Sequence, residues 1–437
     1  MNETTPVSLE EYLSLHPADL ADRLQRLDAD ETEAVLRGLP ADKVAAALSE
    51  VEEDRLPDFL ETFDAAQLAE IVAHLAPDRA ADLLQQLSAG IRRDALAKLP
   101  DEFAEGVRKL LRYPEDTAGG VMTNRFIALR DEMTVEEVRE LLRARAQEER
   151  TEDIAYLYVT DADQHLVGVV SLRDLVFRRE DRRMSEFVNR EVKFVRVDTD
   201  QENLVQQFEH YHYLGLPVLD SDGRLVGAVK ASDVLEVAAK EATEDMQLMV
   251  GLSGEEHAST PWQQSIRGRL PWLYINLATA FLAAFVVGLF EDTIARWTAL
   301  AIFLPIVAGQ GGNAGMQTLT VIIRDLALGE ISPGDGRRAL LKEITLGLLN
   351  GVAIGLAVGL IGWMWKGSIL LGVVAGAAML LNQIAAAAAG VMIPLGLKAV
   401  RLDPALASSI FLTTVTDVAG FFFFLGLASL GLRWLAV

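Results

Sequence analysis

Cysteine is absent from the 437-residue chain, so neither disulfide bonds nor zinc sites with cysteine ligands form. Histidine is nearly as scarce, because the chain has six and none follows His257. An enzyme built into the C-terminal part would need a nucleophile with its base, or a set of metal ligands. The residues after His257 supply no such set, and we predict that the protein is not an enzyme.

Positive charge is also in short supply, with 40 Lys and Arg against 63 Asp and Glu. The imbalance is confined to one part of the chain. From Leu270 onward nine basic and eight acidic residues nearly cancel, so residues 1–269 carry a net charge of −24. Such a region repels nucleic acid and attracts cations, and Mg²⁺ and Ca²⁺ prefer carboxylate oxygens. The plainer interpretation is an acidic surface that keeps the protein soluble.

The beginning of the chain, MNETTPVSLEEYL, has no basic segment followed by an apolar one, so we expect no secretory signal. Residues 8–112 repeat short amphipathic units such as HPADLADRLQRL and FDAAQLAEIVAHL. Each unit begins near Pro or Asp, as helices do, and is too short to bury its apolar face alone. Stacked units can do so, and we predict an all-α superhelical domain over residues 1–118.

A second segment contains an internal repeat. The sequence HLVGVVSLRDLV at 165–176 returns as RLVGAVKASDVL at 224–235. An amphipathic helix, an apolar strand and a polar turn precede each copy, so the unit reads helix, strand, turn, strand, helix. This pattern resembles a tandem CBS pair, with units at 119–182 and 183–240. CBS pairs are regulatory modules, so the resemblance implies an α+β region here that regulates and does not catalyse. Residues 241–268 are then expected to form a connecting helix.

The C-terminal part, 269–437, has five apolar runs of membrane-spanning length, at 270–290, 298–323, 340–364, 369–397 and 405–432. The connections on one side carry eight basic residues, and those on the other side carry only Arg296, Lys366 and Arg433. The positive-inside rule then places the N-terminus in the cytoplasm and the C-terminus outside. We expect a multi-pass protein of the bacterial inner (plasma) membrane.

Asp417 lies inside the fifth run, within FLTTVTDVAGFFFF. A carboxylate at that depth costs about 2.5–3.5 kcal/mol on insertion scales, and such residues usually face a pore or a polar partner. Thr413, Thr414 and Thr416 extend the polarity along the run. We predict a pore-facing carboxylate; the alternative is a structural hydrogen bond between helices.

The second run contains VAGQGGNAGMQ, where four glycines and three amide side chains interrupt the apolar pattern. We predict that Gly309–Gly315 breaks the helix, because lipid tolerates a break only where it lines a water-filled cavity or is buried in protein. The predicted lining residues are Gly311, Gly312, Asn313 and Gln317. The alternative is close helix packing through small residues.

The whole chain resembles the MgtE family of magnesium channels. The most specific segments are YPEDTAGGVMT, KEATEDM, VAGQGGNAGMQ, LDPALASS and TTVTDVAG, together with the CBS pair. The resemblance implies a homodimer in the lipid bilayer, with a pore at the subunit interface in which Asp417 binds hydrated Mg²⁺. It also implies that Mg²⁺ is both substrate and regulatory ligand, and that the CBS pair can bind ATP.

In the family, Mg²⁺ bridges acidic residues between the N-terminal domain, the CBS pair and the connecting helix, and closes the channel. The residues at matching positions here are Asp78, Asp82, Asp200, Glu202, Asp233, Glu236, Glu241, Glu244 and Asp245. Each could equally be a solvated surface carboxylate. His212, Ser409, Met316 and Glu236 depart from the family pattern, and His212 would make its site pH-sensitive.

Other functions remain open from the sequence. A channel or transporter for Co²⁺ or Mn²⁺ would share every motif. A non-conducting membrane-anchored Mg²⁺ sensor would keep the acidic and CBS regions, but it would need neither Asp417 nor the polar second run.

Overall fold

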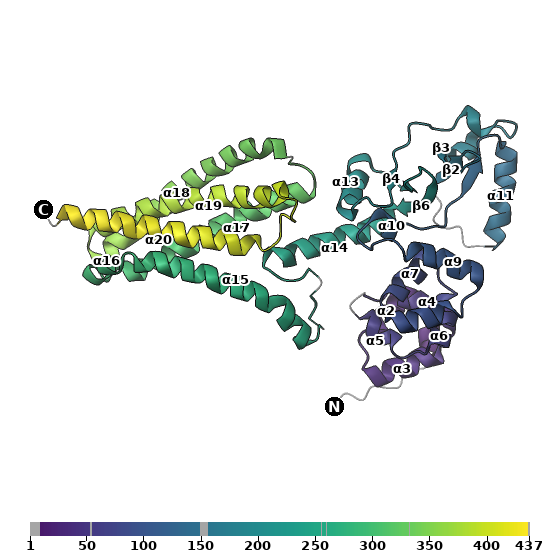
Figure 1. Cartoon of the computed structure of the whole chain (residues 1–437), viewed down its shortest axis with the longest axis horizontal. Helices are drawn as coiled ribbons and strands as arrows, with labels where there is room; N and C mark the ends of the chain where they lie inside the picture. Colours follow the sequence, from purple (N-terminus) through teal and green to yellow (C-terminus); the bar gives the residue numbers. More distant parts are fainter. Residues whose placement is uncertain are drawn as a thin grey trace. The chain divides into compact units, whose positions relative to one another are not determined.

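The computed structural model describes residues 9–52, 55–148, 156–254, 256–258, 260–331 and 333–435. The chain divides into two compact units, Met1–Ala239 and Lys240–Val437. Figure 1 follows the chain from the N-terminal helices to the long C-terminal helices.

Short helices make up the start of the first unit, which confirms the all-α prediction. Asp28 and Asp64 begin two of them by accepting hydrogen bonds from backbone N–H groups of the first turn. Helices two places apart in the chain pack together, as α2 does with α4 and α4 with α6, which is the stacking expected of a superhelix. The helices are α1 (Leu9–Ser14), α2 (Pro17–Leu24), α3 (Ala29–Gly38), α4 (Ala41–Leu48), α5 (Leu56–Leu60), α6 (Ala65–Val72), α7 (Pro77–Gln85), α8 (Ala89–Leu96) and α9 (Asp101–Leu110).

Two three-stranded sheets of identical topology follow, and they confirm the internal repeat. In each sheet the first strand pairs in parallel with the second, and the second pairs antiparallel with the third. The first sheet consists of β1 (Ala128–Arg130), β2 (Tyr156–Thr160) and β3 (Leu166–Ser171), and the second of β4 (Val195–Arg196), β5 (Gly215–Leu219) and β6 (Leu225–Lys230). The helices of this region are α10 (Ala118–Val121), α11 (Val135–Glu148), α12 (Leu172–Phe177), the 3₁₀ turn η1 (Met184–Glu186), α13 (Gln201–Tyr211) and α14 (Ala231–Met249).

The two hairpins turn by the same chemistry. The Oδ1 atom of Asp161 accepts from the backbone N–H groups of residues two and four positions later, both at 2.9 Å. Asp220 does the same in the second copy, at 2.9 and 2.8 Å. The repeat is therefore preserved in its turn geometry as well as in its apolar pattern.

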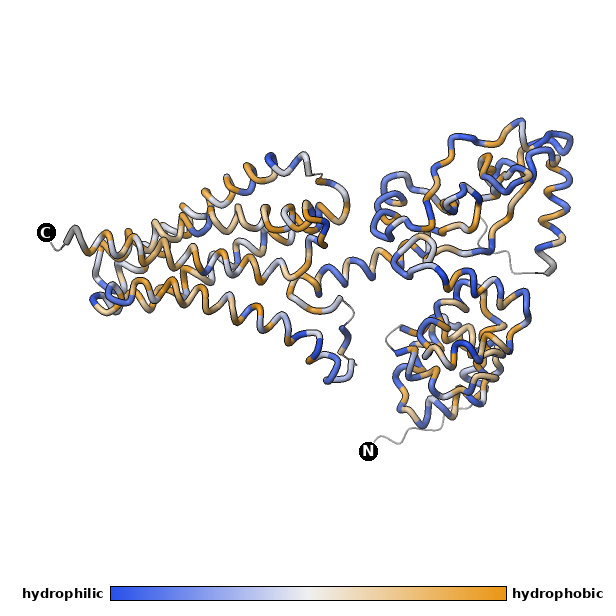
Figure 2. Tube along the Cα trace, in the orientation of Figure 1, coloured by the Kyte–Doolittle hydropathy of each residue, from blue (hydrophilic) through white to orange (hydrophobic). Residues whose placement is uncertain are grey.

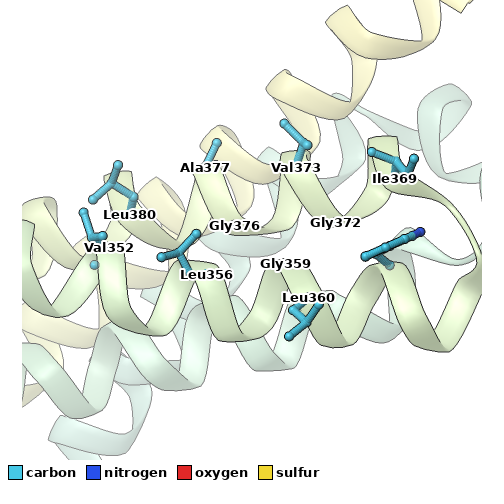
Figure 3. Close-up of a pocket in the computed structure, with 13 residues that line it drawn as sticks. Val352, Leu356, Gly359, Leu360, Ile369, Gly372, Val373, Gly376, Ala377 and Leu380 are labelled. Carbon is cyan, nitrogen blue, oxygen red and sulfur yellow. The ribbon is translucent and has the colours of Figure 1, made fainter.

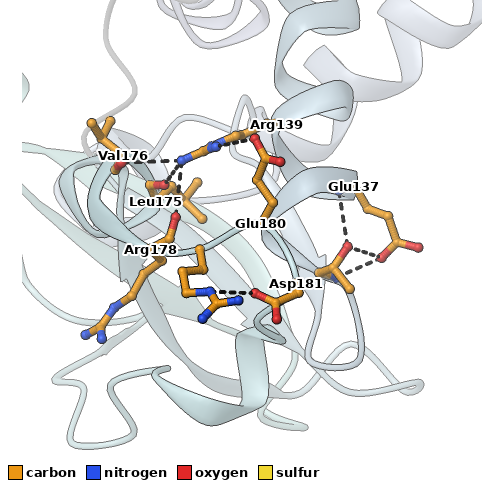
Figure 4. Close-up of polar contacts among 9 residues, drawn as sticks. Glu137, Arg139, Leu175, Val176, Arg178, Glu180 and Asp181 are labelled. Atoms are coloured by element: carbon orange, nitrogen blue, oxygen red, sulfur yellow. Dashed lines mark hydrogen bonds and ion pairs between the residues drawn. The ribbon is translucent and has the colours of Figure 1, made fainter.

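Arg139 of α11 joins that helix to the end of α12 (Figure 4). Its guanidinium donates to the backbone oxygen of Leu175 at 2.5 Å and to the Glu180 carboxylate at 3.2 Å. Carbonyl groups at a helix C-terminus lack intrahelical partners, so a cation there satisfies them. This contact packs the two helices of the first CBS unit together.

The connecting helix predicted over residues 241–268 is only partly correct. Helix α14 ends at Met249, and the next helix, α15, begins at Trp262. Gly251 and Gly254 lie between them with φ angles of +79° and +86°, a conformation that a helix does not accommodate. A non-helical link therefore separates the end of α14 from the first membrane-length helix.

Five long helices form most of the second unit, and Figure 2 shows their mainly hydrophobic sequence. They are α15 (Trp262–Gly288), α17 (Leu300–Ala327), α18 (Gly336–Lys366), α19 (Ile369–Ala399) and α20 (Ser408–Leu435), with the short α16 (Glu291–Arg296) and the 3₁₀ turn η2 (Pro333–Asp335) between them. Among the described residues four helices are apolar and long enough to cross a membrane: α15, α18, α19 and α20. The polar residues of α17 distinguish it from these four.

Candidate ion pathway

Helix α17 is continuous from Leu300 to Ala327, so the predicted break at Gly309–Gly315 is wrong. Glycine lowers helix propensity by about 1 kcal/mol per residue, but it does not prevent the helical hydrogen bonds from forming. In a helix held by its neighbours, packing outweighs that loss. The freed backbone carbonyls expected from a break are therefore not available as ion ligands.

The glycines of α17 serve close packing on one face of the helix. Gly311 and Gly315 are buried. A Cβ atom at Gly315 would lie 2.8 Å from the side chain of Leu412 on α20, too close for a real contact. A Cβ atom at Gly312 would lie 3.9 Å from the Thr416 hydroxyl, also on α20. The packing interpretation of these glycines is therefore correct for this face.

The amides of α17 lie on the opposite face. Gln310, Asn313, Gln317 and Thr320 are all exposed in the single chain. Their spacing of three or four residues places them on one stripe along the helix. We call these four residues the polar stripe. An exposed amide stripe on a membrane-length helix is unfavourable against lipid, so it requires water or protein beside it.

Asp417 lies on α20, next to the helix that carries the polar stripe, because α17 and α20 pack against each other. Its side chain is partly exposed, and it has no hydrogen-bond or ion-pair partner among the residues that the structure describes. A structural hydrogen bond between helices of one chain therefore does not account for this carboxylate.

The threonines around Asp417 donate their hydroxyl hydrogens within their own helix. Thr414 donates to the backbone oxygen of Ile410 at 2.7 Å, and Thr416 donates to that of Thr413 at 3.1 Å. The hydroxyl oxygens keep their lone pairs as acceptors. Thr416 is fully buried against α17, whereas Thr413 and Thr414 are partly exposed. Thr413 and Thr414 can therefore accept hydrogen bonds from water beside Asp417, and Thr416 contributes to helix packing.

Three further polar residues lie inside the helical unit, and the sequence interpretation missed their roles. Glu343 of α18 is 6% exposed and accepts from the Thr318 hydroxyl of α17 at 2.9 Å. Asn382 and Gln383 of α19 are 0% and 1% exposed. A polar residue inside an apolar run is the signal that could have found them, and it is the same signal that singles out Asp417.

A groove of about 560 Å³ lies between α18 and α19, and its lining is apolar (Figure 3). Glycines such as Gly355, Gly359 and Gly376 let the two helix backbones approach closely there. None of the 13 lining residues drawn in Figure 3 carries a charge or an amide. This groove offers a cation no charged or amide side chain, so it is not a candidate ion site.

Four of the predicted regulatory acids gather around one arginine in the first unit. The Arg79 guanidinium of α7 lies 3.8 Å from the Asp233 carboxylate and 3.5 Å from that of Glu236, both on α14. Asp78 and Asp82 flank Arg79 on α7, and the Asp78 Oδ1 atom is buried without a hydrogen-bond partner. We call these four carboxylates the Arg79 cluster.

Burial raises the pKa of the Asp233 carboxyl above its usual range, and the positive charges of Lys230 and Arg79 partly oppose this change. A cation therefore stabilises the ionised form of this carboxylate. In the single chain Lys230 and Arg79 supply that positive charge, and Arg79 lies 3.8 Å from the carboxylate. A divalent ion that approached the cluster would compete with Arg79 for the same oxygens.

The remaining predicted regulatory residues lie elsewhere. Asp200 caps α13 by accepting from the Glu202 backbone N–H at 2.9 Å. Glu241, Glu244 and Asp245 follow one another along α14. His212 ends α13 with a φ angle of +52° and an exposed side chain. Within the described residues, no group of three His, Asp or Glu side chains is arranged to hold a metal.

The end of α14 packs directly onto the candidate pathway. Met249 is buried against Leu319 of α17 and Leu412 of α20. The backbone N–H of Ala407, just before α20, donates to the backbone oxygen of Leu248 at 2.8 Å. Movement of α14 would therefore be transmitted to the start of the helix that carries Asp417.

Family comparisons agree with this division of the chain. Residues 304–427 match the family MgtE, described as a divalent cation transporter. Residues 15–116 match the MgtE intracellular N domain, and residues 118–181 and 184–240 match the CBS domain.

The chain is also similar to characterised proteins over nearly its whole length. It is 36% identical to the magnesium transporter MgtE of Thermus thermophilus over 98% of this chain and 99% of the relative. The corresponding protein of Enterococcus faecalis is 32% identical over 97% of this chain and 94% of its own length. A crystal structure of the cytosolic domain of the Mg²⁺ channel MgtE with ATP is 39% identical, with a TM-score of 0.49 over 52% of this chain and 93% of that one.

Proposed function

This chain belongs to the MgtE family of divalent cation transporters, and on that premise we propose that it is a homodimeric, Mg²⁺-selective channel for magnesium uptake that cytosolic Mg²⁺ closes. The observation that carries the proposal is the exposed polar stripe of α17 beside the unpartnered carboxylate of Asp417. In a membrane both must be covered by something polar.

A second copy of the chain supplies that cover most economically. Two α17 helices facing each other across a symmetry axis would enclose the two polar stripes and two copies of Asp417. Two carboxylates balance the charge of one Mg²⁺. Asp417 is the pore metal ligand in this proposal, and the amides with Thr413 and Thr414 line the path.

The ion passes with most of its hydration water. Mg²⁺ gives up water reluctantly and prefers six oxygens in octahedral geometry. Amide and hydroxyl groups accept or donate hydrogen bonds to bound water, and they need not touch the metal. A site with one carboxylate per chain therefore fits a hydrated ion better than a bare one.

The net negative charge of residues 1–269 supports closure by cytosolic Mg²⁺. The Arg79 cluster lies on α7 and α14, so an ion bound there would fix α14 relative to the N-terminal helices. Because α14 ends against α17 and α20, fixing it favours one state of the pathway. The ion biases gating only by the difference between its affinities for the closed and open states.

Orientation and nucleotide binding complete the proposal. The basic connections support an orientation with the N-terminus in the cytoplasm and the C-terminus outside. For ATP, we propose the cleft of the CBS pair lined by Arg125, Tyr156, Tyr158, Leu214 and Lys230. The partly exposed ring of Tyr156 can stack on a base, and the two cations suit phosphates.

Ion flux into liposomes that contain the purified full-length protein tests this function. We expect Mg²⁺ entry that exceeds Co²⁺ and Mn²⁺ entry at equal concentration, and that stops when the cytosolic side holds millimolar Mg²⁺. Faster Co²⁺ or Mn²⁺ entry would establish the alternative substrate. No flux of any of the three ions would leave the membrane-anchored sensor as the function.

A further inference from the structure

Helix α19 carries two adjacent amide residues in the protein interior. The channel function does not by itself explain why they are buried there. Asn382 and Gln383 are essentially inaccessible, in a helix that packs against α17, α18 and α20. Neither belongs to the polar stripe, because both point into the protein. Their contacts show what they do there.

Both amides donate to backbone carbonyls of the glycine-rich segment of α17. The Asn382 Nδ2 atom lies 2.9 Å from the oxygen of Val307, and the Gln383 Nε2 atom lies 3.4 Å from the oxygen of Gln310. Consecutive residues of α19 therefore hold α17 at two positions that lie three residues apart. Gln310 itself begins the polar stripe.

Asn382 also contacts α20 close to Asp417. A Cβ atom at Gly420 would lie 2.8 Å from the Asn382 Nδ2 atom, and a Cβ atom at Gly311 of α17 would collide with the same amide. Gly420 follows Asp417 by three residues, so the two lie on neighbouring positions of one helix face. The amide of Asn382 thus occupies the space between α17 and α20 beside the pore carboxylate.

Stability alone does not explain an amide at this position. The Asn382 Oδ1 and Gln383 Oε1 atoms are buried and have no hydrogen-bond partner among the described residues. An unpaired buried oxygen is costly, whereas an apolar residue of similar shape would avoid that cost. Buried polar residues in some proteins fix one arrangement of helices at the expense of stability.

We propose that Asn382 is a positioning residue that fixes the spacing of α17 and α20 beside Asp417, and so sets the preference for Mg²⁺ over larger divalent cations. The proposal rests on the proposed function, because it assumes that ions pass between these helices. The amide touches neither the ion nor its water. It acts through the backbone of α17 and the glycine of α20.

Two variants probe this role from opposite sides. Asn382→Leu keeps the branched shape of the side chain and removes the hydrogen bond to Val307, and we expect the ratio of Mg²⁺ to Ca²⁺ flux to fall about fivefold. Gly311→Ala places a methyl group against Asn382, and we expect Mg²⁺ flux to fall about tenfold. In the double variant Gly311→Ala, Asn382→Ala the shorter side chain makes room, so much of the flux lost in Gly311→Ala should return.

The matched control is Gly396→Ala on α19, where a Cβ atom meets nothing within 4 Å, and it should keep wild-type flux and selectivity. Flux is measured in liposomes at equal amounts of monodisperse protein. Parallel loss of Mg²⁺ and Ca²⁺ flux in Asn382→Leu would show a structural role only and overturn the proposal. So would a double variant no better than Gly311→Ala, a comparison that holds even if Asn382→Leu fails to fold. If the wild type conducts neither ion, the proposed function itself fails.

Discussion

Replacement of Asp417 by asparagine should reduce Mg²⁺ flux about 100-fold while leaving the protein folded. Asparagine has nearly the same shape but no charge. Two unit charges 4 Å apart interact by about 4 kcal/mol at an effective dielectric constant of 20, and a hydrated Mg²⁺ lies somewhat farther away. A loss of ~3 kcal/mol at the narrowest point corresponds to roughly two orders of magnitude in flux.

The control for this variant is Asp292→Asn, which neutralises an exposed carboxylate on α16. It should conduct as the wild type does. The measurement is Mg²⁺ entry into liposomes at equal protein content, with size-exclusion profiles to show that each variant is intact. If Asp417→Asn conducted Mg²⁺ like Asp292→Asn, the carboxylate would not be the pore ligand.

Neutralising the Arg79 cluster should abolish closure. With Asp78→Asn, Asp82→Asn, Asp233→Asn and Glu236→Gln combined, no carboxylate of the cluster remains to bind a cation. We expect this variant to keep conducting when the cytosolic side holds millimolar Mg²⁺, whereas the wild type stops. The reason is that bridging α7 to α14 requires charged oxygens on both helices.

Arg79→Gln provides the opposite change at the same place. It removes the cation that already lies among the four carboxylates, so Mg²⁺ meets less competition. Because an exposed ion pair contributes up to about 1 kcal/mol, closure should occur at roughly threefold lower Mg²⁺. Limited proteolysis of the full-length protein at increasing Mg²⁺ supplies a second readout. Equal Mg²⁺ requirements in the wild type, Arg79→Gln and the neutralised variant would contradict the proposed regulatory site.

Sequence patterns correctly predict the structural elements that depend on residues close together in the chain. Hairpin residues Asp161 and Asp220 fix their turns through their own backbone, and the 59-residue repeat correctly predicts a second sheet like the first. The apolar runs predict the long helices for the same reason, because length and hydropathy are properties of the run itself.

The glycine-rich segment shows where such reasoning fails. Four glycines in VAGQGGNAGMQ predict a break when only the low helix propensity of each glycine is considered. In the structure the helix continues, because close packing against α19 and α20 holds it. Leu412 and Asn382 occupy the space that side chains at Gly315 and Gly311 would need. Those contacts come from residues about 70 to 100 positions later in the chain. No local pattern contains them. A polar residue inside an apolar run marks Asn382 and Glu343 in the sequence, but their contacts with α17 are visible only in the fold.

We propose that the polar stripe of α17 lines a water-filled ion path, and substituted-cysteine accessibility tests this most directly. The chain has no cysteine, so a single Asn313→Cys variant carries the only thiol. A charged, membrane-impermeant thiol reagent should modify it and reduce Mg²⁺ flux. Leu356→Cys on α18 lies at a 71% exposed position that lines the apolar groove and that we expect to face lipid, so it should neither react nor change flux. An unreactive Asn313→Cys, or a modified one that conducts unchanged, would contradict the pathway.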